Sequence, residues 1–277
     1  MSTAPLDWLL TGDPSIRWQV MDDLLGLPRE CVAAERARVA TEGRGARLLA
    51  EQDPEWSWAG VRLLLERARR FDGGHTLAAT VSGPEMCITG MPIDLAVAFG
   101  LRDSRVDDTV EWLTAQQLAD GGWTCPAIRR GSGHGSFHTS ITALEAMAAD
   151  ARSGGSVPVA EATVAGREFF LDHHLDRSHH TGEVVDRSFA RFPFPSQWHF
   201  DVVRGLEHVC AVGAVGAARL TEAIEEVRRA QRPDGTWPRH RPYPGRYWFT
   251  MEAPGPSRWS TLRALRVLAW WDGREQT

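Results

Sequence analysis

The sequence predicts an all-α protein built as a closed double ring of alternating inner and outer helices. No useful stretch shows the every-second-residue alternation of a half-buried strand. Nearly wholly apolar segments alternate with amphipathic ones along the 277 residues. Similar segments recur at intervals of about fifty to seventy residues, which is typical of stacked helical hairpins. The apolar helices are expected to line the inside of the ring, and the amphipathic helices its outside.

The apolar segments are the expected inner helices. The first begins at Asp13, a capping residue followed by a proline suited to the first helical position, and Gly26 and Pro28 end it. The other four are expected at residues 87–99, 138–149, 198–212 and 259–271.

Outer helices are expected where the pattern is amphipathic, at residues 31–51, 61–71, 103–117, 161–173 and 221–231. We expect one domain over residues 1–277. The interval between Trp18 and Cys87 looks short for two complete hairpins, so five hairpins, or six with one degraded, are both possible.

Composition excludes several classes of function. The net charge of -5 provides no basic surface for a phosphate backbone, so no nucleic acid partner is expected. The chain has no lysine, which excludes Schiff-base and phosphate-loop chemistry and suits a GC-rich bacterial genome. Without a signal peptide or membrane span, the protein should be cytoplasmic, with its four cysteines reduced.

A seven-residue pattern of Gln, Asp, Gly and Trp occurs twice, at residues 117–123 and 231–237, and each copy ends an outer helix. The two copies resemble the QW motif of squalene and oxidosqualene cyclases and of protein prenyltransferase β subunits, and residues 52–58 resemble a degenerate copy. The resemblance covers roughly residues 5 to 272. It implies the α/α toroid fold and is strongest to short bacterial prenyltransferase-like proteins. The Gln is expected to bond groups at a helix end while the Trp packs across the junction.

The chain departs from these families in its acidic motifs. Cyclases that protonate their substrate use a D-x-D-D acid, and the Asp pairs at 22–23 and 107–108 lack its first Asp. Residues 107–111 superficially resemble a diphosphate-binding motif. They open an outer helix, however, where acidic side chains favour the dipole in any case.

Superposition of the inner helices predicts a shared first-turn position and a shared apolar position further along. The first-turn position is occupied by Trp18, Cys87, His138, Phe200 and Trp259. The later one is occupied by Leu24, Ile93, Leu144, Leu206 and Leu265. Because first turns of adjacent inner helices meet at one mouth of a toroid, the side chains of Cys87 and His138 are expected to meet there.

Protein prenyltransferases hold one zinc with an Asp-x-Cys and with a His at the next inner helix, and Glu85-x-Cys87 and His138 resemble these elements. Cys125, in the loop that leads to His138, is the expected third ligand. Two thiolates and an imidazole would leave one open position, as a catalytic zinc site requires. Glu85 and His134 are substitutes. The alternative is a plainly buried Cys87 and a His138 that only caps its helix.

Further candidates are expected at the same mouth. Asp201, with His199 beside it, is either a general base or an acid that complements a helix dipole. Glu252 lies among aromatic residues that would raise its pKa, and is a candidate acid. Aromatic rings expected to bound an apolar substrate or stabilise a cation are those of Trp18, Trp198, Trp248 and Trp259.

The sequence therefore predicts a zinc-dependent, terpenoid-cyclase- or prenyltransferase-like enzyme that acts on a small apolar or isoprenoid-like substrate in a central cavity. A cyclase without metal is a second enzymatic possibility. The alternative from another class is a non-catalytic toroid that binds a lipid or a peptide and holds a structural zinc or no metal.

Overall fold

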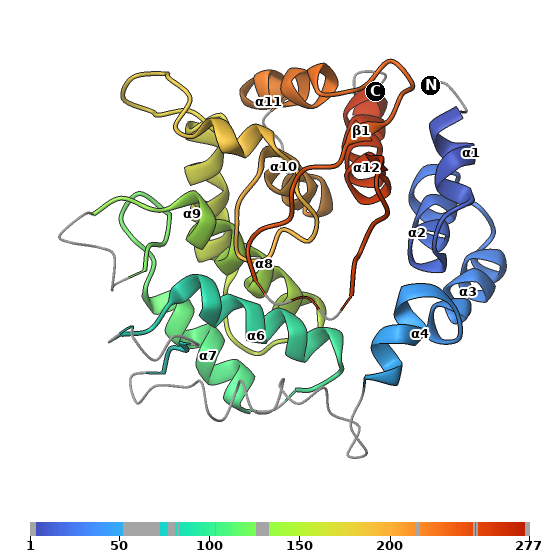
Figure 1. The fold of residues 1–277 in the computed structure, drawn as a ribbon. Helices are drawn as coiled ribbons and strands as arrows, with labels where there is room; N and C mark the ends of the chain where they lie inside the picture. The colour runs from blue at the N-terminus through green and yellow to red at the C-terminus, as the bar shows by residue number, and fades with distance from the viewer. Residues whose placement is uncertain are drawn as a thin grey trace. The chain divides into compact units, whose positions relative to one another are not determined.

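Helices make up most of the structure, a computed structural model that describes residues 4–51, 73–76, 81, 83–102, 104–125, 133–213, 217–245, 247 and 249–274 (Figure 1). The predicted all-α class is therefore confirmed, whereas the toroid stays a prediction. The only regular strands among these residues are β1 (Trp237–Pro238) and β2 (Pro256–Ser257), which pair antiparallel. In the described part of the chain, no helix is both long enough and apolar enough to cross a membrane.

The chain divides into two compact units, which we describe separately. Unit 1 comprises Met1–Gln52, Val184–Gln197 and Asp201–Thr277, and unit 2 comprises Asp53–Glu183 and Trp198–Phe200. The single domain and its number of hairpins stay predictions. Unit 1 contains α1 (Ala4–Leu10), α2 (Pro14–Gln19), the π-turn η1 (Val20–Leu24), α3 (Arg29–Ala37), the 3-10 turn η2 (Arg38–Ala40), α4 (Gly43–Ala50), the 3-10 turn η3 (Arg187–Ala190), α10 (Val202–Ala211), α11 (Ala217–Arg229) and α12 (Arg258–Arg274). Unit 2 contains α6 (Met86–Ala98), α7 (Ser104–Ala115), α8 (Phe137–Arg152) and α9 (Ala160–Asp172).

The apolar segments form helices close to their predicted bounds. The helices α6, α8 and α12 match three of them, and α2 with η1 matches the first, with Asp13 capping α2 by accepting from Ser15 N–H. At the apolar position predicted to be shared, four of the five side chains are buried, those of Ile93, Leu144, Leu206 and Leu265. The fifth, Leu24, is half-buried.

The helix predicted for residues 198–212 begins later than expected, at Val202. Asp201 is the N-cap, because its carboxylate accepts the backbone N–H of Arg204 at 2.8 Å. The three residues before it are therefore outside the helix, although Trp198 and Phe200 resemble the apolar residues of a first turn.

The outer helix predicted for residues 31–51 is interrupted. The chain forms α3 and η2 and then turns at Gly43, whose φ of 66° suits glycine, before α4. The helices α7, α9 and α11 match three other predictions, and residues 61–71 lie outside the described residues.

Unit 2 is organised around the packing of α6 on α8 (Figure 1). Gly90 lies at their closest approach, because a Cβ on Gly90 would lie 2.7 Å from the carbonyl oxygen of Thr142. Since real side chains do not approach backbone so closely, the two helices meet at this distance only with glycine there. This packing fixes the first turns of both helices, where the candidate site lies.

Unit 1 is organised around α12, which packs against α10, α1, α2 and η1. Polar side chains add to the apolar contacts. Arg263, on α12, is buried and pairs with Asp201 at 3.3 Å and with Glu207 at 2.7 Å. Arg266 donates to Gln19 and Asp23 near the N-terminus. Helix α12 thus connects the N-terminal helices of unit 1 with α10.

Candidate functional site

Each QW motif closes the end of an outer helix by the same hydrogen bonds. Gln117 Nε2 donates to Gly121 O at 2.7 Å and to Ala162 O at 2.8 Å, and Gln231 Nε2 donates to Gly235 O at 3.1 Å. The buried indoles of the two motifs donate back to the preceding helices, at Leu113 O for Trp123 and at Val227 O for Trp237. Both glycines have positive φ, 83° and 81°. The structural role predicted for the motif is therefore confirmed.

These two loops, and the loop that contains His75, set the start of three inner helices. In each, a backbone N–H donates at 2.9 Å to a hydroxyl on the helix, from His75 to Thr89, from Trp123 to Ser140 and from Trp237 to Thr261. Each hydroxyl lies two residues after Cys87, His138 or Trp259. These three residues therefore occupy equivalent first-turn positions, as superposition of the sequence predicted.

The equivalence predicted for Trp18 and Phe200 is wrong. Cys87 and His138 lie two residues after their N-caps, Glu85 and Ser136. Trp18 lies five residues after the cap Asp13, and Phe200 lies one residue before the cap Asp201. Apolar residues recur every third or fourth position, so a shift of one turn leaves the sequence pattern almost unchanged.

The first turn of α6 brings two of the predicted metal ligands together. The Sγ atoms of Cys87 and Cys125 lie 3.7 Å apart. Cys125 reaches this place because Trp123, two residues earlier, is fixed to α8 through Ser140. Its Sγ also lies 3.8 Å from the hydroxyl of Thr139, the residue after His138. The two thiols are thus positioned by the repeat architecture.

The surroundings of the pair favour a thiolate on Cys125 and a thiol on Cys87. A hydrogen bond from the Cys87 thiol lowers the pKa of Cys125, whereas burial raises it. Backbone N–H groups of Cys87 and Met86 and the hydroxyl of Thr139 lower this pKa further. The hydrogen bond to Cys125 raises the pKa of Cys87, with burial and the nearby negative charges of Cys125 and Glu85 acting in the same direction. Helix N-termini stabilise thiolates in this way.

The thiol pair fits a zinc ion. Two sulfurs that each lie about 2.3 Å from one tetrahedral zinc are about 3.8 Å apart, close to the observed separation. Thiolate sulfur is also a ligand that zinc prefers. No group of three His, Cys, Asp or Glu side chains within the described ranges is arranged to hold a metal, so the structure assembles two of the three predicted ligands.

His138 is held away from a ligand role by its hydrogen bond. Its Nδ1 accepts the backbone N–H of Phe200 at 2.8 Å, so the neutral ring carries its proton on Nε2. The ring packs edge-on against Trp198 and His199, with centroids 5.3 and 5.7 Å away. For Nε2 to bind a metal, this proton must move to Nδ1 and the bond to Phe200 must break. Metal ligation by His138 stays a prediction.

The two substitute ligands differ in their relation to the thiols. Glu85 accepts from the hydroxyl of Thr76 at 2.6 Å, and its charge acts on Cys87. His134 is largely exposed, and its ring lies 6.1 and 5.9 Å from those of His179 and His180. Glu85 is therefore the better-placed substitute.

Asp201 and Glu252 both bind the first turn of a helix. Besides capping α10, Asp201 pairs with Arg263, and its Oδ2 has no hydrogen-bond partner among the described residues. Glu252 accepts from Ser257 Oγ at 2.8 Å and from Trp259 N–H at 3.1 Å, at the start of α12. These contacts match the dipole alternative for Asp201, and the general-base and acid roles stay predictions.

The predicted aromatic residues have separate surroundings. Trp18 lies under the guanidinium of Arg36, 5.0 Å from its ring centroid. Trp259 stacks on Phe194 at 4.3 Å, and Trp198 stacks on His199 at 3.7 Å. Trp248 lies outside the described residues. Since Trp18 and Trp259 belong to unit 1 and Trp198 to unit 2, their meeting at one mouth stays a prediction.

Sequence reasoning missed His75. His75 takes the place that Trp123 has in the next repeat, and its side chain is buried. The spacing to the paired hydroxyl is 14 residues for His75, 17 for Trp123 and 24 for Trp237, so no fixed interval marks it. The recurring signal in the sequence is a Ser or Thr two residues after Cys87, His138 and Trp259.

No family model, curated protein or solved structure matches this chain. The resemblance to QW-motif proteins accordingly stays an expectation from the sequence. A proposal about function therefore has to be argued from the repeat geometry and the thiol pair alone.

Proposed function

We propose that this protein is a zinc-dependent, terpenoid-cyclase- or prenyltransferase-like enzyme that acts on a small apolar or isoprenoid-like substrate. The observation that supports this proposal most directly is the 3.7 Å separation of Cys87 Sγ and Cys125 Sγ, which suits two thiolates on one zinc. The bond from Trp123 N–H to Ser140, which recurs in the other repeats, positions Cys125 next to Cys87. The two cysteines are therefore not close merely because both happen to be buried.

Cys87 and Cys125 would hold the zinc, with His138 or Glu85 as the third ligand and one position open. A zinc of this kind would supply Lewis acidity, which activates a thiol or water or polarises an oxygen. The backbone N–H groups at the start of α6 and the Thr139 hydroxyl would keep Cys125 deprotonated and fix its orientation. The bond from Phe200 N–H would position the His138 ring until a metal competes for it.

Elemental analysis of the purified protein tests the metal. We expect one zinc per chain in the wild type and less than about a tenth of that in the Cys87→Ser and Cys125→Ser variants, because a single thiolate is a poor zinc site. The Cys31→Ser/Cys210→Ser double variant is the matched control and should keep its zinc, since neither residue belongs to the pair. Zinc that is absent from the wild type, or that survives both single substitutions, would contradict the proposal.

X-ray absorption of the zinc protein distinguishes a catalytic site from a structural one. An enzyme should show two sulfurs, one or two lighter protein ligands and an exchangeable position that small thiols enter. The alternative function is a non-catalytic binding module, which the bond between His138 and Phe200 favours because that bond withholds an imidazole. A closed set of four protein ligands, unaffected by added thiol, would favour that module.

A further inference from the structure

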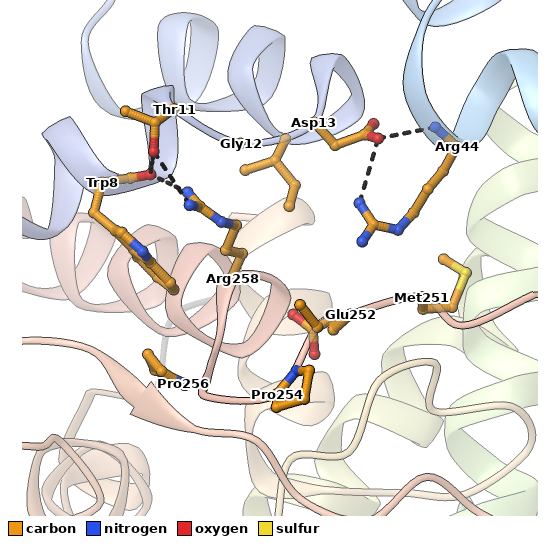
Figure 2. A pocket seen from close by; sticks show the side chains of 12 residues that line it. Trp8, Thr11, Gly12, Asp13, Arg44, Met251, Glu252, Pro254, Pro256 and Arg258 are labelled. Carbon is orange, nitrogen blue, oxygen red and sulfur yellow. Dashed lines mark hydrogen bonds and ion pairs between the residues drawn. The ribbon is translucent and has the colours of Figure 1, made fainter.

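Unit 1 contains a cavity of about 380 Å³ that is lined by none of the proposed zinc ligands (Figure 2). Residues from three parts of the chain line it: the α1–α2 turn, α4, and the segment before α12. The lining residues with charged or aromatic side chains are Trp8, Asp13, Arg44, Glu252 and Arg258. The cavity therefore combines charged groups of both signs with apolar walls.

Two guanidinium groups face this cavity. Arg258 donates to Trp8 O and to Thr11 Oγ1, and its guanidinium lies 4.2 Å from the centroid of the Trp8 ring (Figure 2). Arg44 donates to Asp13, and its buried Nε has no hydrogen-bond partner among the described residues. Burial lowers the pKa of Arg258, and the positive charge of Arg44 lowers it further, whereas the negative charge of Glu252 acts in the opposite direction. An anion between the two arginines would relieve both effects.

Both carboxylates of the cavity accept hydrogen bonds, and Asp13 accepts more of them than Glu252 does. Each carboxylate oxygen of Asp13 accepts two hydrogen bonds. Oδ1 accepts from the backbone N–H and the hydroxyl of Ser15, and Oδ2 accepts from the backbone N–H and Nη1 of Arg44. Glu252 accepts from Ser257 and Trp259 at the start of α12. Among the described residues, Arg258 forms no ion pair with a carboxylate, although the charge of Glu252 acts on it from a greater distance. The cavity is thus richer in spare donors than in spare acceptors.

The charge and the walls of the cavity define the class of ligand. The N–H groups of the two arginines that have no partner in the described part of the chain can bind one carboxylate. Asp13 and Glu252, in contrast, repel the larger charge of a phosphate more strongly than that of a carboxylate. Ile16, Met251 and Pro254 supply apolar surface beside the charged groups. We propose that this cavity binds a small organic monocarboxylate with an apolar body, its carboxylate between Arg44 and Arg258 and its body against the ring of Trp8 and the apolar wall.

Isothermal titration calorimetry with the full chain tests the proposal. Phenylacetate is the probe, because it carries one carboxylate on an apolar ring. Phenylacetamide has the same shape without the charge, and inorganic phosphate has the charge without the ring. We expect phenylacetate to bind with a 1:1 stoichiometry and the other two at least about tenfold more weakly. Phenylacetamide loses the charge-assisted contact with the arginines, and phosphate loses the contact of an apolar body with Trp8 and the apolar wall.

Three variants locate the binding. Arg44→Gln and Arg258→Gln should each weaken phenylacetate at least tenfold. Arg229→Gln should leave it unchanged, since Arg229 is an exposed arginine on α11, away from the cavity lining. Ala253→Phe fills the cavity from an exposed lining position and keeps both guanidinium groups, so it should abolish binding even if an arginine variant fails to fold.

The outcomes separate clearly. Phenylacetate binding that is lost in Arg44→Gln, Arg258→Gln and Ala253→Phe and kept in Arg229→Gln supports the site. No detectable binding to the wild type at millimolar phenylacetate, or undiminished binding to Ala253→Phe, overturns it. Phosphate that binds more tightly than phenylacetate overturns the monocarboxylate class. None of these results depends on zinc, because Cys87 and Cys125 belong to unit 2.

Discussion

At the residue scale, the Cys87–Cys125 pair is the chemically distinctive feature of the molecule. Two thiols 3.7 Å apart share one proton more readily than two isolated thiols, because the remaining S–H donates to the thiolate. Cys125 receives additional donors from backbone N–H groups at the start of α6. The pair therefore loses its first proton easily and its second with difficulty.

We predict that the metal-free protein forms one thiolate near pH 6, since the surroundings lower the pKa of Cys125 to about 6. Thiolate absorbance in the ultraviolet, followed against pH, measures it. Cys125→Ser should remove this titration. Cys87→Ala should move it to higher pH, because the thiolate loses the donor that contributes most to the lowered pKa. The control Cys31→Ser should change nothing near pH 6, and a wild type without a thiolate below pH 8 would refute the assignment.

At the element scale, the QW motif sets the register of the inner helices. The Trp of each motif bonds two helices. Its indole N–H donates to the helix that the motif ends, and its backbone N–H donates to the helix that follows. The two copies differ in the burial of their Gln. Gln117 is half-buried and bonds two carbonyls, whereas Gln231 bonds one carbonyl at an exposed position.

We predict that Gln117→Ala destabilises the protein more than Gln231→Ala. The first substitution leaves two carbonyls without their donor and should cost about 1–2 kcal/mol, and the second less than about 1 kcal/mol. Urea denaturation of the two variants gives the comparison. Equal losses would mean that the second bond of Gln117, to Ala162 O, contributes nothing to stability.

The sequence predicts which segments of this protein are helical better than it predicts the residue at which each helix begins. Apolar periodicity and the two full QW copies were sufficient for α6, α8 and α12, and for the equivalence of Cys87 with His138. The start of α10 was missed because the aromatic residues Trp198 and Phe200 lie before the cap Asp201 and resemble the first turn of a buried helix. The meeting of Cys87 with Cys125 was predicted, whereas the bond from Phe200 to His138 was not, since it joins residues 62 positions apart.

At the scale of the whole molecule, each of the two proposed binding sites lies within one compact unit. The thiol pair belongs to unit 2, and the cavity with Arg44 and Arg258 belongs to unit 1. A ligand that binds only folded protein raises the free energy of unfolding of whatever cooperative unit contains its site.

We predict that zinc raises the melting temperature. At a free zinc concentration one hundred times its dissociation constant, the added stability is about 2.7 kcal/mol. Differential scanning calorimetry with and without zinc measures the shift, and a chelator should reverse it. The Cys87→Ser/Cys125→Ser variant should melt at the same temperature under both conditions. A zinc-dependent shift that persists in this variant would mean that the metal binds elsewhere.

The bonds from α12 to the N-terminal helices have a consequence for synthesis on the ribosome. Arg258 bonds Trp8, 250 residues earlier, and Arg266 bonds Asp23, 243 residues earlier. The first helices therefore leave the ribosome long before their packing partner is translated, whereas α6 to α9 follow one another in a continuous stretch of chain. Because domains generally fold as they emerge, we expect unit 2 to become protease-resistant on the nascent chain before unit 1 does.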